Sequence, residues 1–179
     1  KQKSELYSRM KILIDGMQQC QRSSRGKAGF LWAAPVPSDG NVERQFDRVE
    51  IGKANIFDDA WVPWYTMHKL IAGIVDVYKA TGYAPAKEVG SNLGDWVYNR
   101  CSKWSEQTHR TVLSIEYGGM NDCLYDLYAV TGKDSHAVAA HYFDETALFE
   151  KVMNGGRNVL TNRHANTTIP KFIGALKRY

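Results

Sequence analysis

Apolar residues recur three or four positions apart along much of this chain, which is the spacing of one face of an α-helix. The first stripe runs over residues 4–21, with Ser4 as a possible N-cap, and should pack one helix face inward. Further stripes lie within residues 65–81, 89–101, 120–131 and 138–143. The pattern therefore predicts an all-α fold.

Part of the helical pattern is repeated. Four residues recur at an offset of 50, because Asp76, Tyr78, Thr81 and Gly82 correspond to Asp126, Tyr128, Thr131 and Gly132. A third copy is expected to begin at residues 169–171. A helical hairpin cannot bury its apolar face alone and must stack on neighbours. Residues 64–179 are therefore expected to form stacked helical hairpins, and the complete architecture should contain more hairpins than this chain supplies.

Residues 22–63 differ from the rest of the chain, since Gly and Pro interrupt any helical period there. Aromatic residues nevertheless remain frequent, among them Phe30, Trp32, Phe46, Phe57 and Trp61. Disordered linkers are poor in aromatic residues, and a long loop within a compact domain is more often functional than idle. We expect this segment to be an ordered, irregular cap.

Length and composition narrow the class of protein. A chain of 179 residues, with 44% hydrophobic and 23% charged residues, fits one globular domain. The net charge of +4 comes from scattered basic residues, which gives no support to nucleic-acid binding. Apolar runs are far shorter than a membrane span, so no membrane partner is expected. The chain starts without Met and stops inside a predicted helix, which suggests a single domain truncated at both ends.

The cysteines offer little chemistry on their own. Cys20, Cys101 and Cys123 are odd in number and lack CxxC spacing. They therefore indicate neither a complete disulfide framework nor a self-contained zinc site, and they leave the redox compartment open.

Three polar segments, residues 61–69, 114–122 and 163–170, precede or begin the repeated helices. His68 and Pro170 are expected in the first turns of their helices, and a glycine pair precedes the helix between them. Helix N-termini directed at a common axis would gather an imidazole, a carboxylate and an amide around one cavity. Aromatic faces with convergent polar groups typically bind sugars, and Trp61 and Trp64 are candidate platforms.

Each candidate also has a purely structural interpretation. His68 could cap a helix or fill a core position, and Glu116 could stabilise a helix N-terminus. Residues 164–167 could form an Asx-type turn, and Trp64 could belong to the core. Glu116 and Asp122 are not assigned as a catalytic pair, because their separation cannot be predicted. His109, His136 and His141 are expected on polar helix surfaces or connections and receive no role.

Several motifs occur in an order that resembles a known family. They are Trp61–Leu70, Asp95–Arg100, Glu116–Asp122 and His164–Thr167, and the similarity runs from about residue 20 to Tyr179. The chain is similar to the β-L-arabinofuranosidases of glycoside hydrolase families 127 and 146. Asp122 stands where members often have Glu. The resemblance implies an (α/α)6 toroid whose funnel binds a terminal arabinofuranose, of which this chain would form an incomplete part.

The resemblance also implies retaining hydrolysis by a zinc-bound Cys nucleophile and a Glu general acid/base. In the family these groups follow the His-Ala-Asn-Thr motif, which places them beyond Tyr179. No catalytic residue, metal ligand or zinc is therefore expected in this chain. Sugar contacts are expected at His68, His164, Glu116, Asn121, Asp122 and Asn166, in addition to the Trp64 platform.

An arabinose-containing glycan would be the partner of this enzyme, and the exposed face of a partial toroid could support self-association. Two alternative functions remain. A helical-toroid epimerase or uronidase would keep the fold and change the reaction. A non-catalytic carbohydrate-binding or scaffolding module would keep neither nucleophile nor acid/base.

Overall fold

The computed structural model describes residues 2–34, 37–55 and 61–179, so the candidate aromatic residue Phe57 lies outside the described residues. Within these ranges the regular elements are nine α-helices, without strands, which confirms the all-α prediction. The helices are α1 (Gln2–Arg22), α2 (Arg44–Glu50), α3 (Pro63–Thr81), α4 (Ala84–Cys101), α5 (Glu106–Leu113), α6 (Met120–Thr131), α7 (Asp134–His141), α8 (Thr146–Met153) and α9 (Ala165–Lys177).

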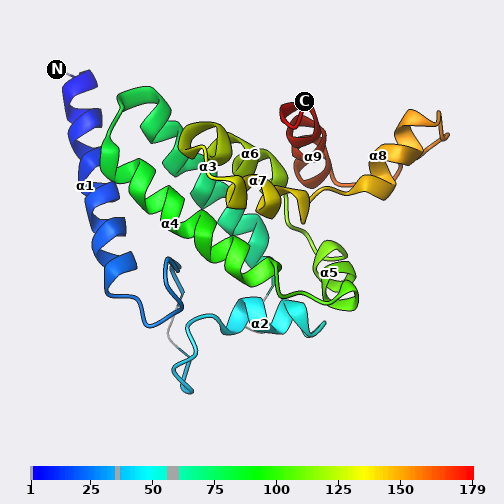
Figure 1. Ribbon diagram of the computed structural model, residues 1–179, viewed down its shortest axis with the longest axis horizontal. Helices are drawn as coiled ribbons and strands as arrows, with labels where there is room; N and C mark the ends of the chain where they lie inside the picture. Colours follow the sequence, from blue (N-terminus) through cyan, green and yellow to red (C-terminus); the bar gives the residue numbers. More distant parts are fainter. Residues whose placement is uncertain (1, 35–36, 56–60) are drawn as a thin grey trace.

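The longer helices form two rows (Figure 1). In the first row α3 packs on α6 and α6 packs on α9, and in the second row α1 packs on α4 and α4 on α7. The rows contact each other through α3 with α4, α4 with α6, and α6 with α7. The short helices α2, α5 and α8 each lead from a second-row helix to the next first-row helix. The expected stack of helical hairpins is therefore present.

First-row helices run parallel, and their equivalent ends meet. Near the start of the row, the Gly119 N–H of α6 donates to His68 Nδ1 of α3 at 3.1 Å. Near the other end, Lys79 Nζ of α3 and Lys177 Nζ of α9 lie 2.7 and 2.6 Å from the two carboxylate oxygens of Asp126. The N-terminal parts of α3, α6 and α9 are consequently gathered at one end of the row.

The two Thr-Gly helix ends are the same structure used twice. In each, the hydroxyl of Thr81 or Thr131 donates to the carbonyl four residues earlier, at 2.6 and 2.9 Å. Each hydroxyl also accepts the N–H two residues later, at 3.2 and 3.4 Å. Gly82 and Gly132 adopt left-handed φ values of 66° and 69° and end the helices. The repeat seen in the sequence is therefore a structural repeat.

An aromatic cluster joins the irregular segment to the helices. Phe30 and Phe46 come from residues 22–63, and each ring centroid lies 5.0 Å from that of Trp96 on α4. Trp64 is only 1% exposed and contacts Phe46 and Phe143, at centroid distances of 4.8 and 5.1 Å. The described part of the cap is therefore ordered by burial of its own aromatic side chains.

Within the cap, α2 is a helix that the sequence analysis did not separate from the irregular segment. The Arg100 guanidinium on α4, only 4% exposed, contacts Glu43, Asp47 and Glu50 at 2.8, 2.5 and 2.5 Å. These carboxylates share one face of α2 because they lie three or four residues apart. Burial alone would raise the pKa of Asp47, but hydrogen bonds from Arg100 and Asn41 outweigh it and lower that pKa.

Several local predictions were wrong. The first helix begins at Gln2, so Ser4 lies inside it and is not its N-cap. Leu6 and Leu13 of its apolar stripe are exposed, whereas Ile14 is buried. The hydrogen bonds that join α1 to α4 come from the second half of α1, for example that of Gln21 Nε2 to the Val89 carbonyl at 3.1 Å.

Helix starts were also misplaced. Because α3 begins at Pro63, His68 lies in its second turn, and the boundary of the helical part shifts from residue 64 to 63. Similarly, α9 begins at Ala165, so Pro170 lies inside the helix and not in its first turn. His136, expected on a polar surface, is fully buried between Thr131 Oγ1 at 2.7 Å and Asp95 Oδ1 at 3.1 Å.

Candidate sugar-binding site

Gly119 marks the point where the three first-row helices meet. It is the N-cap residue of α6, and it has no side chain to separate its neighbours. A Cβ atom at this position would lie 2.6 Å from Pro170 Cβ on α9, 3.1 Å from His68 Nε2 on α3 and 3.3 Å from Asp122 Cβ. One residue from each of the three polar segments therefore lies at this point, namely His68, Gly119 and Pro170.

His68 is the polar side chain at the centre of this convergence. Its imidazole is 4% exposed, accepts the Gly119 N–H through Nδ1, and packs edge-on against Tyr65 with ring centroids 5.9 Å apart. Burial, with a smaller contribution from the charge of Lys69, lowers the pKa of His68 to about 4. The ring is therefore neutral at pH 7, and its proton resides on Nε2. Within the described ranges, no side chain or carbonyl accepts a hydrogen bond from that Nε2.

Four other predicted contacts lie in the segments that lead into α6 and α9 or in the first turns of these helices. Glu116 is exposed and lies two residues before Gly118 in the segment that leads into α6. His164 occupies the N-cap position of α9, and Asn166 lies in its first turn, both exposed. Asp122 is partly buried, and its Oδ1 lies 2.5 Å from Lys177 Nζ. Exposed carboxylate, amide and imidazole groups are thus present at the starts of α6 and α9, while Asp122 is held by an ion pair.

Two of the residues predicted to contact the sugar, Asn121 and Trp64, are buried in the protein interior. The Asn121 amide is fully buried, and its Nδ2 donates to Asp144 Oδ1 and to the Lys171 carbonyl, both at 3.0 Å. Its Oδ1 accepts the Asp122 N–H at 2.9 Å. Trp64 belongs to the core, which was one of its two interpretations from the sequence. Its ring is 1% exposed, so neither face is available for stacking on a sugar. Trp61, in contrast, is exposed.

A polar cluster beside the site was missed by the sequence analysis. Lys171 follows Pro170 on α9, and its Nζ lies 2.8 Å from Glu145 and 4.1 Å from the centre of the Tyr117 ring. Arg163 also pairs with Glu145, at 3.1 Å. Burial would raise the pKa of Glu145, but the bond to Lys171 and the two positive charges outweigh it and lower that pKa. The cluster fixes the start of α9 against the residues before α8.

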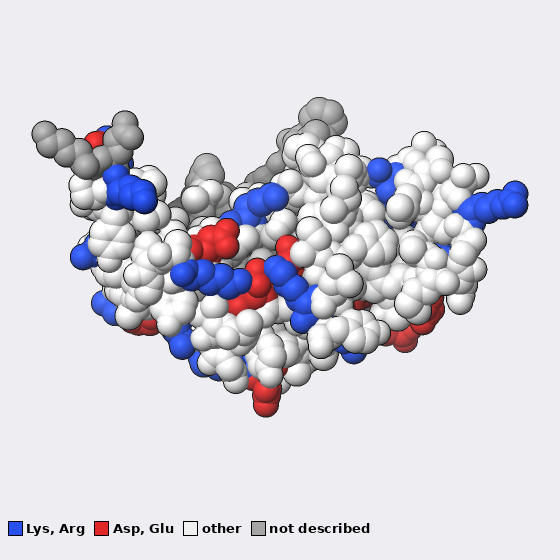
Figure 2. Space-filling model, turned by 90° about the horizontal axis from the view of Figure 1, so that it is seen from above, with Lys and Arg blue, Asp and Glu red and all other residues white. Residues whose placement is uncertain are grey.

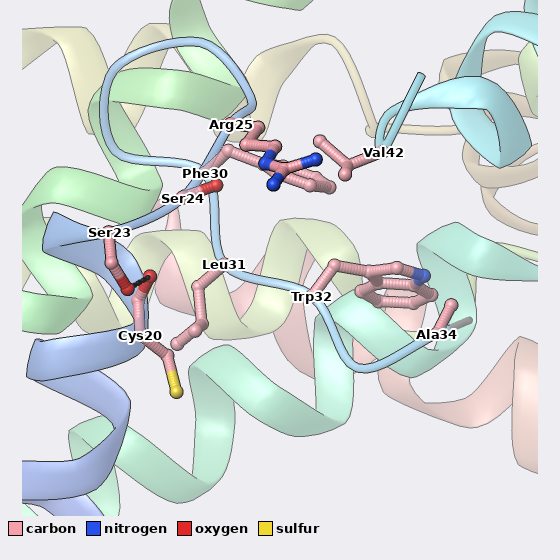
Figure 3. Close-up of a pocket in the computed structure, with 9 residues that line it drawn as sticks. All are labelled: Cys20, Ser23, Ser24, Arg25, Phe30, Leu31, Trp32, Ala34 and Val42. Atoms are coloured by element: carbon pink, nitrogen blue, oxygen red, sulfur yellow. Dashed lines mark hydrogen bonds between the residues drawn. The ribbon is translucent and has the colours of Figure 1, made fainter. Parts of the chain in front are cut away.

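A separate hollow of about 390 Å³ lies between the end of α1 and the cap (Figure 3). Figure 3 shows Cys20 and Ser23 at one end of it and Trp32 and Ala34 at the other. Its lining contains one thiol and one Arg side chain, Arg25, but no carboxylate or imidazole. It therefore lacks the convergent polar set found around His68.

The residues that the structure describes do not fit a zinc site. No group of three or more His, Cys, Asp or Glu side chains among them is arranged to hold a metal ion. Burial raises the pKa of Cys101 to about 12 and that of Cys123 well above its ordinary value, so both thiols stay protonated. A zinc ligand or nucleophile must be a thiolate.

Charge and hydropathy add two observations. On the face shown in Figure 2, Lys and Arg side chains lie beside Asp and Glu, without a large patch of one sign. The described helices include none with both the length and the apolar character needed to cross a bilayer.

Comparison with known proteins identifies a matching family. Residues 1–179 match the protein-family model described as "Beta-L-arabinofuranosidase, GH127 catalytic domain". A comparison with curated protein sequences finds no match. The match covers the whole chain, including the two rows of helices and the three segments that converge on Gly119. The chain therefore belongs to the GH127 β-L-arabinofuranosidase catalytic-domain family.

Proposed function

We propose that this domain supplies the sugar-binding part of a β-L-arabinofuranosidase, with His68 as its central contact. The observation that carries the proposal is a neutral imidazole, 4% exposed, whose Nε2–H has no partner among the described residues, at the point where α3, α6 and α9 meet. This Nε2 is not among the described buried atoms that lack a hydrogen-bond partner, which are Trp64 Nε1 and Asp122 Oδ1, so it is open to a ligand, and a sugar oxygen would accept its hydrogen bond.

Around His68, the exposed groups of Glu116, His164 and Asn166 would contact the remaining hydroxyls of the sugar. Asp122, paired with Lys177, would accept hydrogen bonds without acting as an acid. We assign Asn121 and Trp64 supporting roles, since Asn121 joins α6 to α9 and Trp64 anchors the start of α3 in the aromatic cluster.

Bond cleavage requires groups that we place outside this sequence. Retaining hydrolysis needs a nucleophile and a general acid/base on opposite sides of the glycosidic bond. Both buried thiols are protonated, and Asp122 is held by Lys177. We therefore expect the nucleophile, the acid/base and any zinc ligands to lie beyond Tyr179, and the chain alone to bind an arabinofuranoside without cleaving it.

Calorimetry with methyl β-L-arabinofuranoside tests the proposal. The wild-type chain should bind this sugar in preference to its D enantiomer, and prolonged incubation should release no arabinose. His68→Ala should weaken binding about tenfold or more, the effect of losing about 1.4 kcal/mol. His141→Ala removes an exposed imidazole at the end of α7 and serves as the control. Equal binding by His68→Ala and wild type would contradict the proposal.

Two alternatives predict different outcomes. A non-catalytic carbohydrate-binding module predicts sugar binding by this chain and no hydrolysis by any longer polypeptide that contains it. An epimerase or uronidase predicts a changed or unsaturated sugar as the product, and the GH127 family match does not favour it.

A further inference from the structure

The glycine pair before α6 allows a close approach that other residues would prevent. Gly118 has a left-handed φ of +57°. A Cβ atom there would lie 2.6 Å from His68 Nδ1 and 2.8 Å from the Tyr65 ring. Such contacts are too short for any side chain, so the backbone at Gly118 can lie against the imidazole only because this residue is glycine.

This approach determines which ring nitrogen of His68 carries the proton. The Gly119 N–H points at Nδ1 from 3.1 Å, and a backbone N–H can only donate. Nδ1 must therefore accept, and in the neutral ring the proton resides on Nε2. Free imidazole exchanges between two tautomers, whereas this contact selects one.

Few charged groups surround the ring. On its own helix, Lys69 disfavours a positive charge on His68. On α6 the nearest carboxylate belongs to Asp122, which Lys177 of α9 neutralises. The α9 residue that approaches Gly119 is Pro170, which has no charge. Of the described carboxylates nearby, Asp122 is thus not free to stabilise an imidazolium, and Glu116 is exposed to solvent and does not contribute to the pKa of His68.

We propose that Gly118 and Gly119 are positioning residues that hold His68 as the Nε2–H tautomer, so that it meets the sugar as a hydrogen-bond donor and not as an acceptor. This inference rests on the proposed function and deepens it, because it states which sugar atoms His68 recognises. Those atoms are acceptors, such as the lone pairs of a hydroxyl or ring oxygen. A general-base role for His68 is excluded by the same geometry, because the only basic nitrogen faces the protein backbone.

Nitrogen NMR on the ¹⁵N-labelled chain tests the tautomer without any sugar. The expected result is a scalar coupling between the Gly119 amide nitrogen and His68 Nδ1, transmitted through the hydrogen bond. Nε2 should carry the proton, and the ring should stay neutral from pH 7 to about pH 5. A proton on Nδ1, or titration of the ring near its ordinary pKa of about 6.5, would overturn the inference.

A pair of glycine variants separates this contact from general backbone strain. Gly118→Ala should abolish the coupling and weaken sugar binding about tenfold. Gly82→Ala is the matched control, because Gly82 also has a left-handed φ, of 66°, but a Cβ there would meet no atom within 4 Å. It should keep both the coupling and the affinity. Retention of the coupling in Gly118→Ala would contradict the positioning role.

Two substitutions of His68 keep the idea testable if Gly118→Ala does not fold. Gln places an amide N–H near the position of Nε2, whereas Asn places its polar atoms near Nδ1. His68→Gln should therefore retain more sugar binding than His68→Asn, and the reverse order would count against the donor role. If the coupling is observed but no sugar binds, the proposed function is rejected and the tautomer assignment is kept. If sugar binds but the coupling is absent, only the tautomer assignment is rejected.

Discussion

At the scale of single residues, burial of the His68 ring links protonation to stability. The folded pKa is about 4, while an unfolded histidine titrates near 6.5. Between these values the unfolded chain binds more protons than the folded chain, so stability falls as the pH falls. The stabilisation from a neutral His68 is therefore fully present above about pH 6.5 and is lost as the pH approaches 4.

Urea unfolding at pH 7 and pH 5 measures this effect. Wild type should lose up to roughly 2 kcal/mol more than His68→Asn between these pH values, because Asn cannot take up the proton. Asp47, Asp126 and Glu145, whose pKa values are also lowered, titrate in both proteins and cancel in the comparison. An identical pH dependence in the two proteins would show that His68 is not buried in its neutral form.

The sequence identified His68 but could not identify its partner. A histidine near a helix start beside aromatic residues is a visible signal, and so is the glycine pair fifty residues later. The hydrogen bond between them depends on two helices being packed in register, which no local pattern encodes. For the same reason the role of Trp64 was left open and His136 was placed on the surface. Trp64 is buried by contacts with α2 and α4, and His136 on α7 is buried against α4.

At the scale of elements, a short helix is held in place by one buried cation. Arg100 joins α4 to three carboxylates of α2 and its N-cap, while Trp104 donates to Glu50 at 2.8 Å. Removing one partner of a buried ion pair leaves uncompensated charge, which is far more costly than losing an exposed pair. The docking of α2 therefore depends on Arg100 more than on helix propensity.

Replacing Arg100 tests this dependence. Arg100→Met should reduce the free energy of unfolding by about 3–5 kcal/mol, measured by urea denaturation. Arg110→Met removes an exposed pair with Glu106 one turn away on α5 and should change it by less than about 0.5 kcal/mol. Equal effects of the two substitutions would mean that the Arg100 contacts are not desolvated.

Helix contacts through glycine provide a second test. Gly94 on α4 lies where a Cβ would be 2.5 Å from Leu127 of α6 and 2.8 Å from His136 of α7, whereas Gly73 on α3 faces open space. Gly94→Ala should destabilise the protein by about 1–3 kcal/mol, and Gly73→Ala should stabilise it by about 0.5–1 kcal/mol. Thermal and urea unfolding would measure both. A stabilising Gly94→Ala would indicate looser packing between the two rows.

The long helices and the eight-residue α7 were predicted from the sequence, whereas the short helices α2, α5 and α8 were not. Thr81-Gly82 and Thr131-Gly132 combine a repeated stripe with a left-handed glycine, and both signals are local. The helices α2, α5 and α8 have seven or eight residues each, too few for a clear period. Among their buried residues are Phe46, Val112 and Leu148, so tertiary contacts hold these helices in place. Pro170 was placed in the first turn of its helix for want of the same information, since it lies inside α9, close to Gly119.

At the scale of the whole molecule, the last helix pair has an open apolar side. A groove of about 750 Å³ between α8 and α9 is lined by Phe149, Phe172 and other apolar side chains. Met153 and Leu176 at its border are 77% and 76% exposed. Stacked helical units bury such faces against a neighbour, which supports the proposed self-association of this chain.

Sedimentation velocity over a range of concentrations tests the self-association. Wild type should sediment faster as its concentration rises, and the double substitution Met153→Glu with Leu176→Glu should remove this trend. Ile51→Glu changes an exposed apolar residue next to α2, away from the groove, and is the control. A wild-type chain that stays monomeric at every concentration would contradict the proposal.

The most direct test of the account is residue-by-residue mapping of methyl β-L-arabinofuranoside on the ¹⁵N-labelled chain by NMR titration. The predicted result is that the largest shifts occur at the Gly118 and Gly119 amides and at the His68 ring, with smaller shifts at Glu116 and Asn166. Shifts confined to the hollow lined by Cys20 and Trp32, or no shifts at any concentration, would contradict the placement of the sugar at the start of α6.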